Sequence, residues 1–236
     1  MIYEFKEFKD MQGKSIYYKA LSITNKGTAR DRVEAFNFLN RAADLGYPMA
    51  QYALATWYLH GIVIEKDYHE AVKLLKQAAD SGIVQAKYDL AVCYETGYGI
   101  RKSLKKAIEL YLEAAKQGDR DSKVEVARCF YFGLGISRSY SSAAYWYKKA
   151  ALKGDVEAQY VIARAYELGE GVCKSSRWPD YWYAKASEKR YKQHRQASNE
   201  PCQRQSTKKR IRKAPVRFER ALGGDRRLNR DAPLFC

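Results

Sequence analysis

The chain has 236 residues, 46% of them hydrophobic, and a formal net charge of +16, so it is long enough for one large domain or two small ones. No run of about 18 apolar residues occurs, which excludes a membrane-spanning helix, and the first residues lack the basic-then-apolar pattern of a signal peptide. We therefore expect a cytoplasmic protein with no membrane partner. Its five cysteines are expected to be reduced, since their number is odd and no Cys-x-x-Cys pair is present.

A 36-residue repeat organises most of the chain. The Gly-x-Gly stretch at 97–99 recurs at 133–135 and 169–171. Small residues keep the same step, as alanine pairs at 42–43, 78–79, 114–115 and 150–151 and as single glycines at Gly46, Gly82, Gly118 and Gly154. Small residues held in one register over successive periods are typical of helical repeat proteins.

Each period predicts two helices joined by the glycine-containing turn. The first helix covers 50–61, 86–97, 122–133 and 158–169, where apolar residues recur three and four positions apart. The second helix, as at 69–82 and 105–118, ends at a glycine, which accepts the left-handed backbone that often terminates a helix. Good N-cap residues stand in one register before the second helices, at Asp31, Asp67, Ser103, Ser139 and Ser175.

These periods predict a solenoid over residues 1–190, made of five units at about 11–46, 47–82, 83–118, 119–154 and 155–190. The end units depart from the pattern. Residues 11–30 fit it loosely, and Pro179 replaces an alanine, so it is expected either to lie in the first turn of its helix or to reset the helix start. Such departures are expected because terminal repeats cap an array.

Positive charge is concentrated in the last part of the chain. Residues 189–236 carry 15 Lys/Arg and 4 Asp/Glu, a net charge of +11, which leaves 28 Lys/Arg and 23 Asp/Glu, a net charge of +5, for residues 1–188. The Arg-rich composition and weak periodicity predict a basic, flexible tail over 191–236. Such a tail can contact nucleic acid, which gives the chain an alternative function.

The repeat resembles the Sel-one-like repeat (SLR) family, a relative of the tetratricopeptide repeat. The resemblance is carried by the first helix, turn and second helix of 86–118, by the second helix of 143–154 and by the first helix and turn of 158–172. It covers about residues 11–190. It implies an all-α fold, a right-handed superhelical α-solenoid of about five helix-turn-helix units, whose members are mostly adaptors for protein complexes.

The motifs that could carry chemistry have structural explanations. The Gly-x-Gly stretch follows a predicted helix and lacks the third glycine of a dinucleotide-binding fingerprint. Ser103-x-x-Lys106 has the spacing of a serine-nucleophile dyad, but Ser103 is the expected N-cap. The three histidines have no metal-binding spacing. We therefore predict a protein that is not an enzyme and has no cofactor, metal site or small-molecule substrate.

Cys93 and Cys129 occupy the same repeat position. Equivalent atoms in stacked units are expected to lie about 9–10 Å apart, whereas the Cα atoms of a disulfide lie within about 7 Å of each other. We predict that these cysteines are unlinked packing residues.

The first helices of two-helix repeats line the concave face of a solenoid, by analogy with the tetratricopeptide pattern. The predicted partner-binding residues on this face are Tyr52, Leu59, Tyr88, Glu95, Arg128, Tyr131, Phe132, Tyr160 and Arg164. Tyr and Arg are common in binding hot spots; the alternative is that the tyrosines pack between units. Adjacent Tyr131 and Phe132 cannot both face the helix core. We therefore predict a protein–protein interaction scaffold, either an adaptor or an inhibitor. The alternative is a nucleic-acid-associated protein acting through the tail, and a hydrolase is a weaker third hypothesis.

Overall fold

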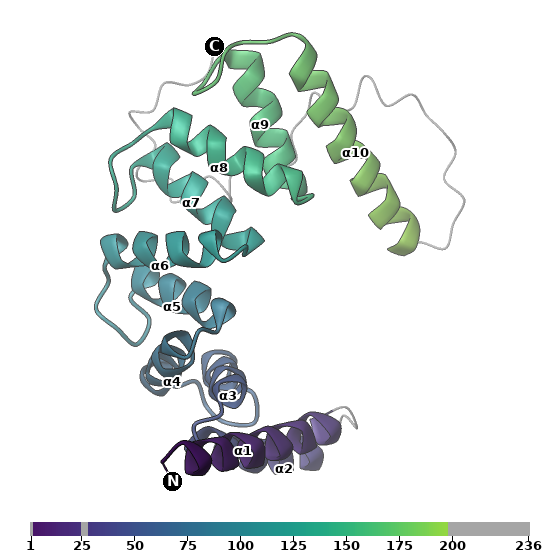
Figure 1. Ribbon diagram of the computed structural model, residues 1–236. Coiled ribbons are helices and arrows are strands. Elements are labelled where there is room, and N and C mark those ends of the chain that lie inside the picture. Colours follow the sequence, from purple (N-terminus) through teal and green to yellow (C-terminus); the bar gives the residue numbers. More distant parts are fainter. Residues whose placement is uncertain (1, 25–27, 198–236) are drawn as a thin grey trace. The chain divides into compact units, whose positions relative to one another are not determined.

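The computed structural model describes the backbone of residues 2–24 and 28–197 and the side chains of 11–24 and 28–188. In these ranges the secondary structure is helical, with no β-strand (Figure 1). The helices are α1 (Ile2–Thr24), α2 (Ala29–Asp44), α3 (Pro48–His60), α4 (Tyr68–Asp80), α5 (Val84–Thr96), α6 (Leu104–Lys116), α7 (Arg120–Phe132), α8 (Tyr140–Leu152), α9 (Val156–Leu168) and α10 (Arg177–Ala197). The predicted all-α class of two-helix repeats is confirmed.

The helices divide into two compact units, and the division falls within α7. Among the described residues, the first unit holds 2–24, 28–129 and 133–138, and the second holds 130–132 and 139–197. In the first unit α1 packs on α2, α3 on α4 and α5 on α6, and these pairs are joined through α2–α3 and α4–α5 contacts. In the second unit α9 packs between α8 and α10. From α1 to α6 in the first unit and from α8 to α10 in the second, helices therefore pack on their neighbours in sequence, as in a solenoid.

The first helices α3, α5, α7 and α9 each end at a left-handed glycine. The N–H of Gly97, with φ 89°, donates to the carbonyl of Cys93, and Gly61, Gly133 and Gly169 take the same conformation. The second glycine of the turn is needed for a different reason. A Cβ on Gly99 would lie 2.0 Å from the carbonyl oxygen of Tyr68. The Gly-x-Gly stretch is thus a turn that packs directly on the backbone of the preceding repeat.

Side-chain oxygens satisfy the first N–H groups of the second helices at most of the predicted positions. Asp67, Ser103 and Ser139 are the N-caps of α4, α6 and α8, and the Ser175 hydroxyl accepts from the first two N–H groups of α10. The prediction for Asp31 is wrong. Thr28 caps α2, and Asp31 is the third helical residue, whose carboxylate accepts from the Thr28 N–H in a capping box.

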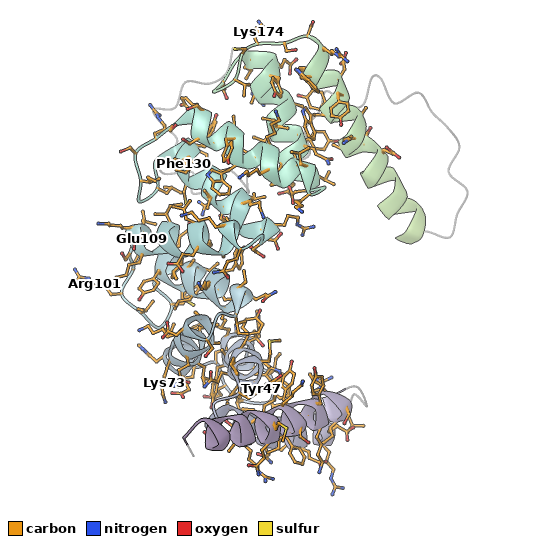
Figure 2. The ribbon with its side chains drawn as sticks, viewed as in Figure 1. Tyr47, Lys73, Arg101, Glu109, Phe130 and Lys174 are labelled. Carbon is orange, nitrogen blue, oxygen red and sulfur yellow. The ribbon has the colours of Figure 1, made fainter. Side chains whose placement is uncertain are left out.

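Small residues allow the helices to approach closely, and side chains of successive helices fill the space between them (Figure 2). The alanines of the four predicted pairs are all buried. Cys93 and Cys129 are buried free thiols, as predicted, and burial raises their pKa to about 11 and about 12. Pro179 lies in the first turn of α10, also as predicted.

The last described helix continues to Ala197, so the first seven residues assigned to the tail are helical. The rest of the predicted tail, 198–236, lies outside the described residues. Among the described helices, none combines the length and the apolar character needed to cross a bilayer.

Candidate functional site

The nine predicted contact residues lie on the first helices of the repeats. Within each unit, we call the surface formed by these positions the first-helix face; in the first unit they lie on α3, α5 and α7 up to Arg128, and in the second on the end of α7 and on α9. Phe132 is exposed, at 40% of its full accessible surface, and the other eight side chains are half-buried. Leu59 and Tyr52 also pack against the hydrophobic core of the first unit. These two residues therefore contribute to stability as well as to the surface.

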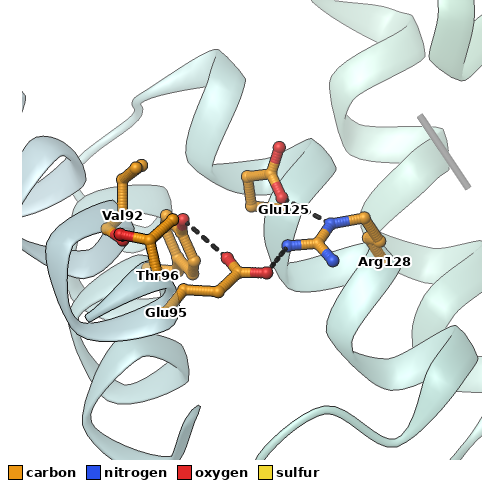
Figure 3. A network of polar contacts seen from close by, with 6 residues as sticks. Val92, Glu95, Thr96, Glu125 and Arg128 are labelled. Carbon is orange, nitrogen blue, oxygen red and sulfur yellow. Dashed lines mark hydrogen bonds and ion pairs between the residues drawn. The ribbon is translucent and has the colours of Figure 1, made fainter. Parts of the chain in front are cut away.

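In the first unit, the first-helix face is organised around the Glu95 carboxylate (Figure 3). The Tyr111 hydroxyl, from α6, donates to Glu95 Oε2 over 3.1 Å, and the Arg128 guanidinium donates through Nη2 to Glu95 Oε1. Arg128 Nε donates to Glu125 Oε2 over 2.7 Å. One arginine thus joins two carboxylates from successive first helices, and its single positive charge is shared between them. Such charge-assisted contacts fix side-chain positions more firmly than neutral hydrogen bonds.

Arg128 is held in its charged form. Burial opposes its charge, but the carboxylates of Glu125 and Glu95 outweigh this and raise the pKa of the guanidinium. The same carboxylates that favour the charged form of the arginine favour the neutral form of the tyrosine. The pKa of Tyr111 is raised by burial and by Glu95 and Glu125, so its hydroxyl remains a donor.

Two further tyrosines of this face lie beside acidic groups. Tyr88 packs on Tyr111 with ring centroids 5.6 Å apart, and burial together with Glu125 raises the pKa of Tyr88. Burial, with a hydrogen bond to Asp89, raises the pKa of Tyr52 to about 12. The polar groups of the first-helix face in this unit are therefore neutral phenols, carboxylates and the Arg128 guanidinium that pairs with two of those carboxylates.

In the second unit, aromatic rings gather at the end of α7. Tyr131 contacts the neighbouring Phe132 with ring centroids 5.0 Å apart, and it also contacts Tyr140 of α8 at 5.1 Å. Its hydroxyl donates to Glu170 Oε2 over 3.4 Å. Phe132 and Tyr140 are both exposed. The three rings form an accessible aromatic cluster, which is the kind of surface that supplies hot spots in protein interfaces.

The α9 helix of the same unit carries the two remaining predicted residues. Tyr160 packs on Tyr183 of α10, with ring centroids 5.8 Å apart, and the Tyr183 hydroxyl donates to Glu167 Oε2 over 3.3 Å. Arg164 lies near enough to Tyr131 and Tyr183 to oppose the rise in their pKa. Burial nevertheless raises the pKa of both tyrosines to about 12.

The sequence reasoning missed the second-helix tyrosines that complete these clusters. Tyr111 and Tyr183 hold the carboxylates of Glu95 and Glu167 from the neighbouring helix. A signal was present, because each tyrosine stands 16 residues after its glutamate and the two pairs are 72 residues apart, or two repeats. A search for recurrence at double the repeat length would have found it.

The first-helix face offers aromatic surfaces, phenolic donors, carboxylates and guanidinium groups, several of them joined by hydrogen bonds or ion pairs. The Ser103 hydroxyl of the candidate dyad accepts from the Lys106 backbone N–H at 3.4 Å, the geometry of a helix cap. In the part of the chain that is described, no three His, Cys, Asp or Glu side chains gather in a way that could hold a metal ion.

Comparison with known proteins gives a consistent relationship. The Sel1 repeat family model matches residues 22–47, 48–83, 84–119, 121–155 and 156–176. The structure is similar to that of a Sel1 repeat protein from Oxalobacter formigenes, with 30% identity and a TM-score of 0.69, over 75% of this chain and 73% of that one. It is also similar to a protective antigen of uropathogenic Escherichia coli that displays an SLR fold, with 28% identity and a TM-score of 0.72. That match covers 75% of this chain but only 38% of the antigen. A search of the curated proteins found no match.

Proposed function

Because the chain belongs to the Sel1 repeat family, we propose that it is a scaffold that holds a partner protein on its first-helix face, as an adaptor or an inhibitor. Sel1 repeat proteins generally mediate protein–protein interaction, and the family is a repeat scaffold without an enzymatic centre. The observation that carries the proposal is the aromatic cluster at the end of α7, in which the exposed rings of Phe132 and Tyr140 contact Tyr131.

The first-helix face has the properties of a preformed interface. The Tyr131 ring is braced by Phe132, by Tyr140 and by the hydrogen bond to Glu170. Rigid aromatic side chains bind a partner with a small loss of conformational entropy. In the first unit the Arg128 ion pairs fix the polar groups in the same way. A partner is therefore expected to find its contacts already in place.

The test is affinity capture from the source cells, with quantitative mass spectrometry of the bound proteins. Tyr131→Ala/Phe132→Ala changes the proposed surface, and Tyr145→Ala is the control, because Tyr145 is an exposed aromatic residue of the same unit on the second helix α8. We expect the double variant to lose a partner that wild type and the control retain. Equal recovery of the same proteins by all three would contradict the proposal. Circular dichroism checks that the variants are folded.

Nucleic-acid association through the basic tail remains a sequence-based alternative. Most of that segment lies outside the described residues, and no observation in the described part of the chain favours it. Deletion of 198–236 separates the two functions, since it removes the basic segment and leaves every residue of the first-helix face in place.

A further inference from the structure

The two compact units contain the same tyrosine–tyrosine–glutamate cluster. In the first unit it is Tyr88, Tyr111 and Glu95, and in the second the equivalent residues are Tyr160, Tyr183 and Glu167, each 72 residues later. The paired rings lie 5.6 Å and 5.8 Å apart, with interplanar angles of 55° and 50°. The phenol–carboxylate hydrogen bonds measure 3.1 Å and 3.3 Å. The local geometry is thus repeated together with the residue types.

The two clusters differ in what else contacts the carboxylate. In the first unit, Glu95 takes the Arg128 guanidinium on the oxygen that Tyr111 leaves free, and the two ionic side chains are 22% and 14% exposed. In the second unit, Tyr183 is the hydrogen-bond donor to Glu167 among the described side chains, and Glu167 is exposed to solvent. Because the two clusters share residue types and geometry, the guanidinium that contacts Glu95 indicates the kind of group that fits beside Glu167.

A pocket adjoins the second cluster. It measures about 280 Å³ and is lined by Glu167, Lys174, Ser175, Ser176, Pro179 and Asp180, with Lys174 labelled in Figure 2. The two carboxylates and two serine hydroxyls of this lining can accept hydrogen bonds from a cationic ligand, whereas the ammonium group of Lys174 repels it. The Ser175 hydroxyl already accepts from the first two N–H groups of α10, so these two donors are not open to an anion.

The geometry points to a binding site for an arginine side chain of a partner protein, formed by Glu167 and Asp180 beside the Tyr160–Tyr183 pair. This inference rests on the proposed function, and it names the chemistry of one contact on the partner. A guanidinium presents several donors in one plane and can bind a carboxylate through two parallel hydrogen bonds, which a lysine ammonium does not reproduce. Arg128 makes this contact within the first unit. Arg164, on the same helix as Glu167, carries positive charge near the cluster and, like Lys174, opposes a cation, so the favourable contacts come from the two carboxylates.

The site can be tested on the isolated full chain with short peptides, independently of any captured partner. Acetyl-Gly-Arg-Gly-amide is titrated into isotope-labelled protein and followed by the backbone NMR signals of α9 and α10. Three further peptides carry citrulline, lysine or glutamate in place of arginine. Citrulline keeps the shape of arginine without the charge, and glutamate probes whether Lys174 dominates the pocket.

Glu167→Gln and Asp180→Asn are the test variants, and Glu157→Gln is the control, because Glu157 is an exposed carboxylate in the first turn of the same helix. We expect the arginine peptide to bind wild type and the control alike, and the test variants about tenfold more weakly, as for the loss of a charge-assisted hydrogen bond. The citrulline peptide should bind wild type about as weakly as the arginine peptide binds the variants.

Equal binding of the arginine and citrulline peptides, or unchanged binding of the arginine peptide to both test variants, would overturn the inference. Tighter binding of the glutamate peptide would assign the pocket to an acidic group and overturn it too, and so would equal binding of lysine and arginine. None of these results affects the capture experiment above, in which Glu167 is not altered, so the failure of one proposal is distinguishable from the failure of the other.

Discussion

Replacing Gly99 with alanine tests the turn that joins the two helices of a repeat and packs on the preceding repeat. The backbone of Gly99 has φ +65°, and an added Cβ would lie 2.0 Å from the carbonyl oxygen and 2.3 Å from the carbonyl carbon of Tyr68. An ordinary contact is about 3.4 Å or longer, so the turn must move by more than an ångström relative to α4. Gly82→Ala is the matched control, because Gly82 also has a positive φ, of 91°, but nothing lies within 4 Å of its Cβ position.

The two substitutions separate backbone strain from steric overlap. A left-handed alanine costs about 1–2 kcal/mol, which is offset by about 0.4–1 kcal/mol from the stiffer unfolded chain, so Gly82→Ala should destabilise the protein by about 1 kcal/mol. Overlap adds about 1–3 kcal/mol, so Gly99→Ala should cost about 2–4 kcal/mol. Urea unfolding followed by far-UV circular dichroism measures both. Equal costs for the two variants would refute the close packing of the turn.

Two further predictions concern the polar groups of the first-helix face. Arg128→Met leaves the carboxylates of Glu95 and Glu125 without their cationic partner. Because the three side chains are 14–25% exposed, we expect the free energy of unfolding to fall by about 1–3 kcal/mol, less than for a fully buried pair. Adding Glu95→Gln should recover part of this loss, and purely additive effects in the double variant would show that the two side chains are not coupled. Stability should also fall as the pH rises from about 10 to about 12. The cause is that tyrosines with a pKa raised to about 12 in the folded protein ionise near pH 10 when the chain is unfolded. The urea midpoint at successive pH values measures this effect, and a constant midpoint over that range would contradict it.

The architecture followed from positions where the backbone restricts the residue type. Glycine is needed where φ is positive and where the chain approaches another backbone, so the glycine step gave the turns and the period. The serine and aspartate register gave the caps of the later second helices. It failed at Asp31 because Thr28, three residues earlier, supplies the capping oxygen in the atypical first repeat.

The site was only partly predictable, because its clusters depend on contacts between helices. The repeat pattern predicts a surface position for Glu95, but its partner Tyr111 lies on the second helix, in a register where other repeats place Leu75 or Tyr147. At that register an aromatic residue is ordinary core, and its hydroxyl reaches a carboxylate only when the first helix supplies one. The positions of the first-helix face could therefore be predicted, whereas the pairs that fix its side chains could not.

The most direct test of the first-helix face is site-specific photo-crosslinking. A photoreactive phenylalanine analogue is placed at Phe132 on α7 or, as the control, at Tyr145 on α8, both exposed aromatic positions of one unit. After irradiation in the source cells, mass spectrometry identifies what each position has captured. We predict a defined partner protein cross-linked at position 132 and not at 145. Capture of the same partner at 145 and not at 132 would contradict the account.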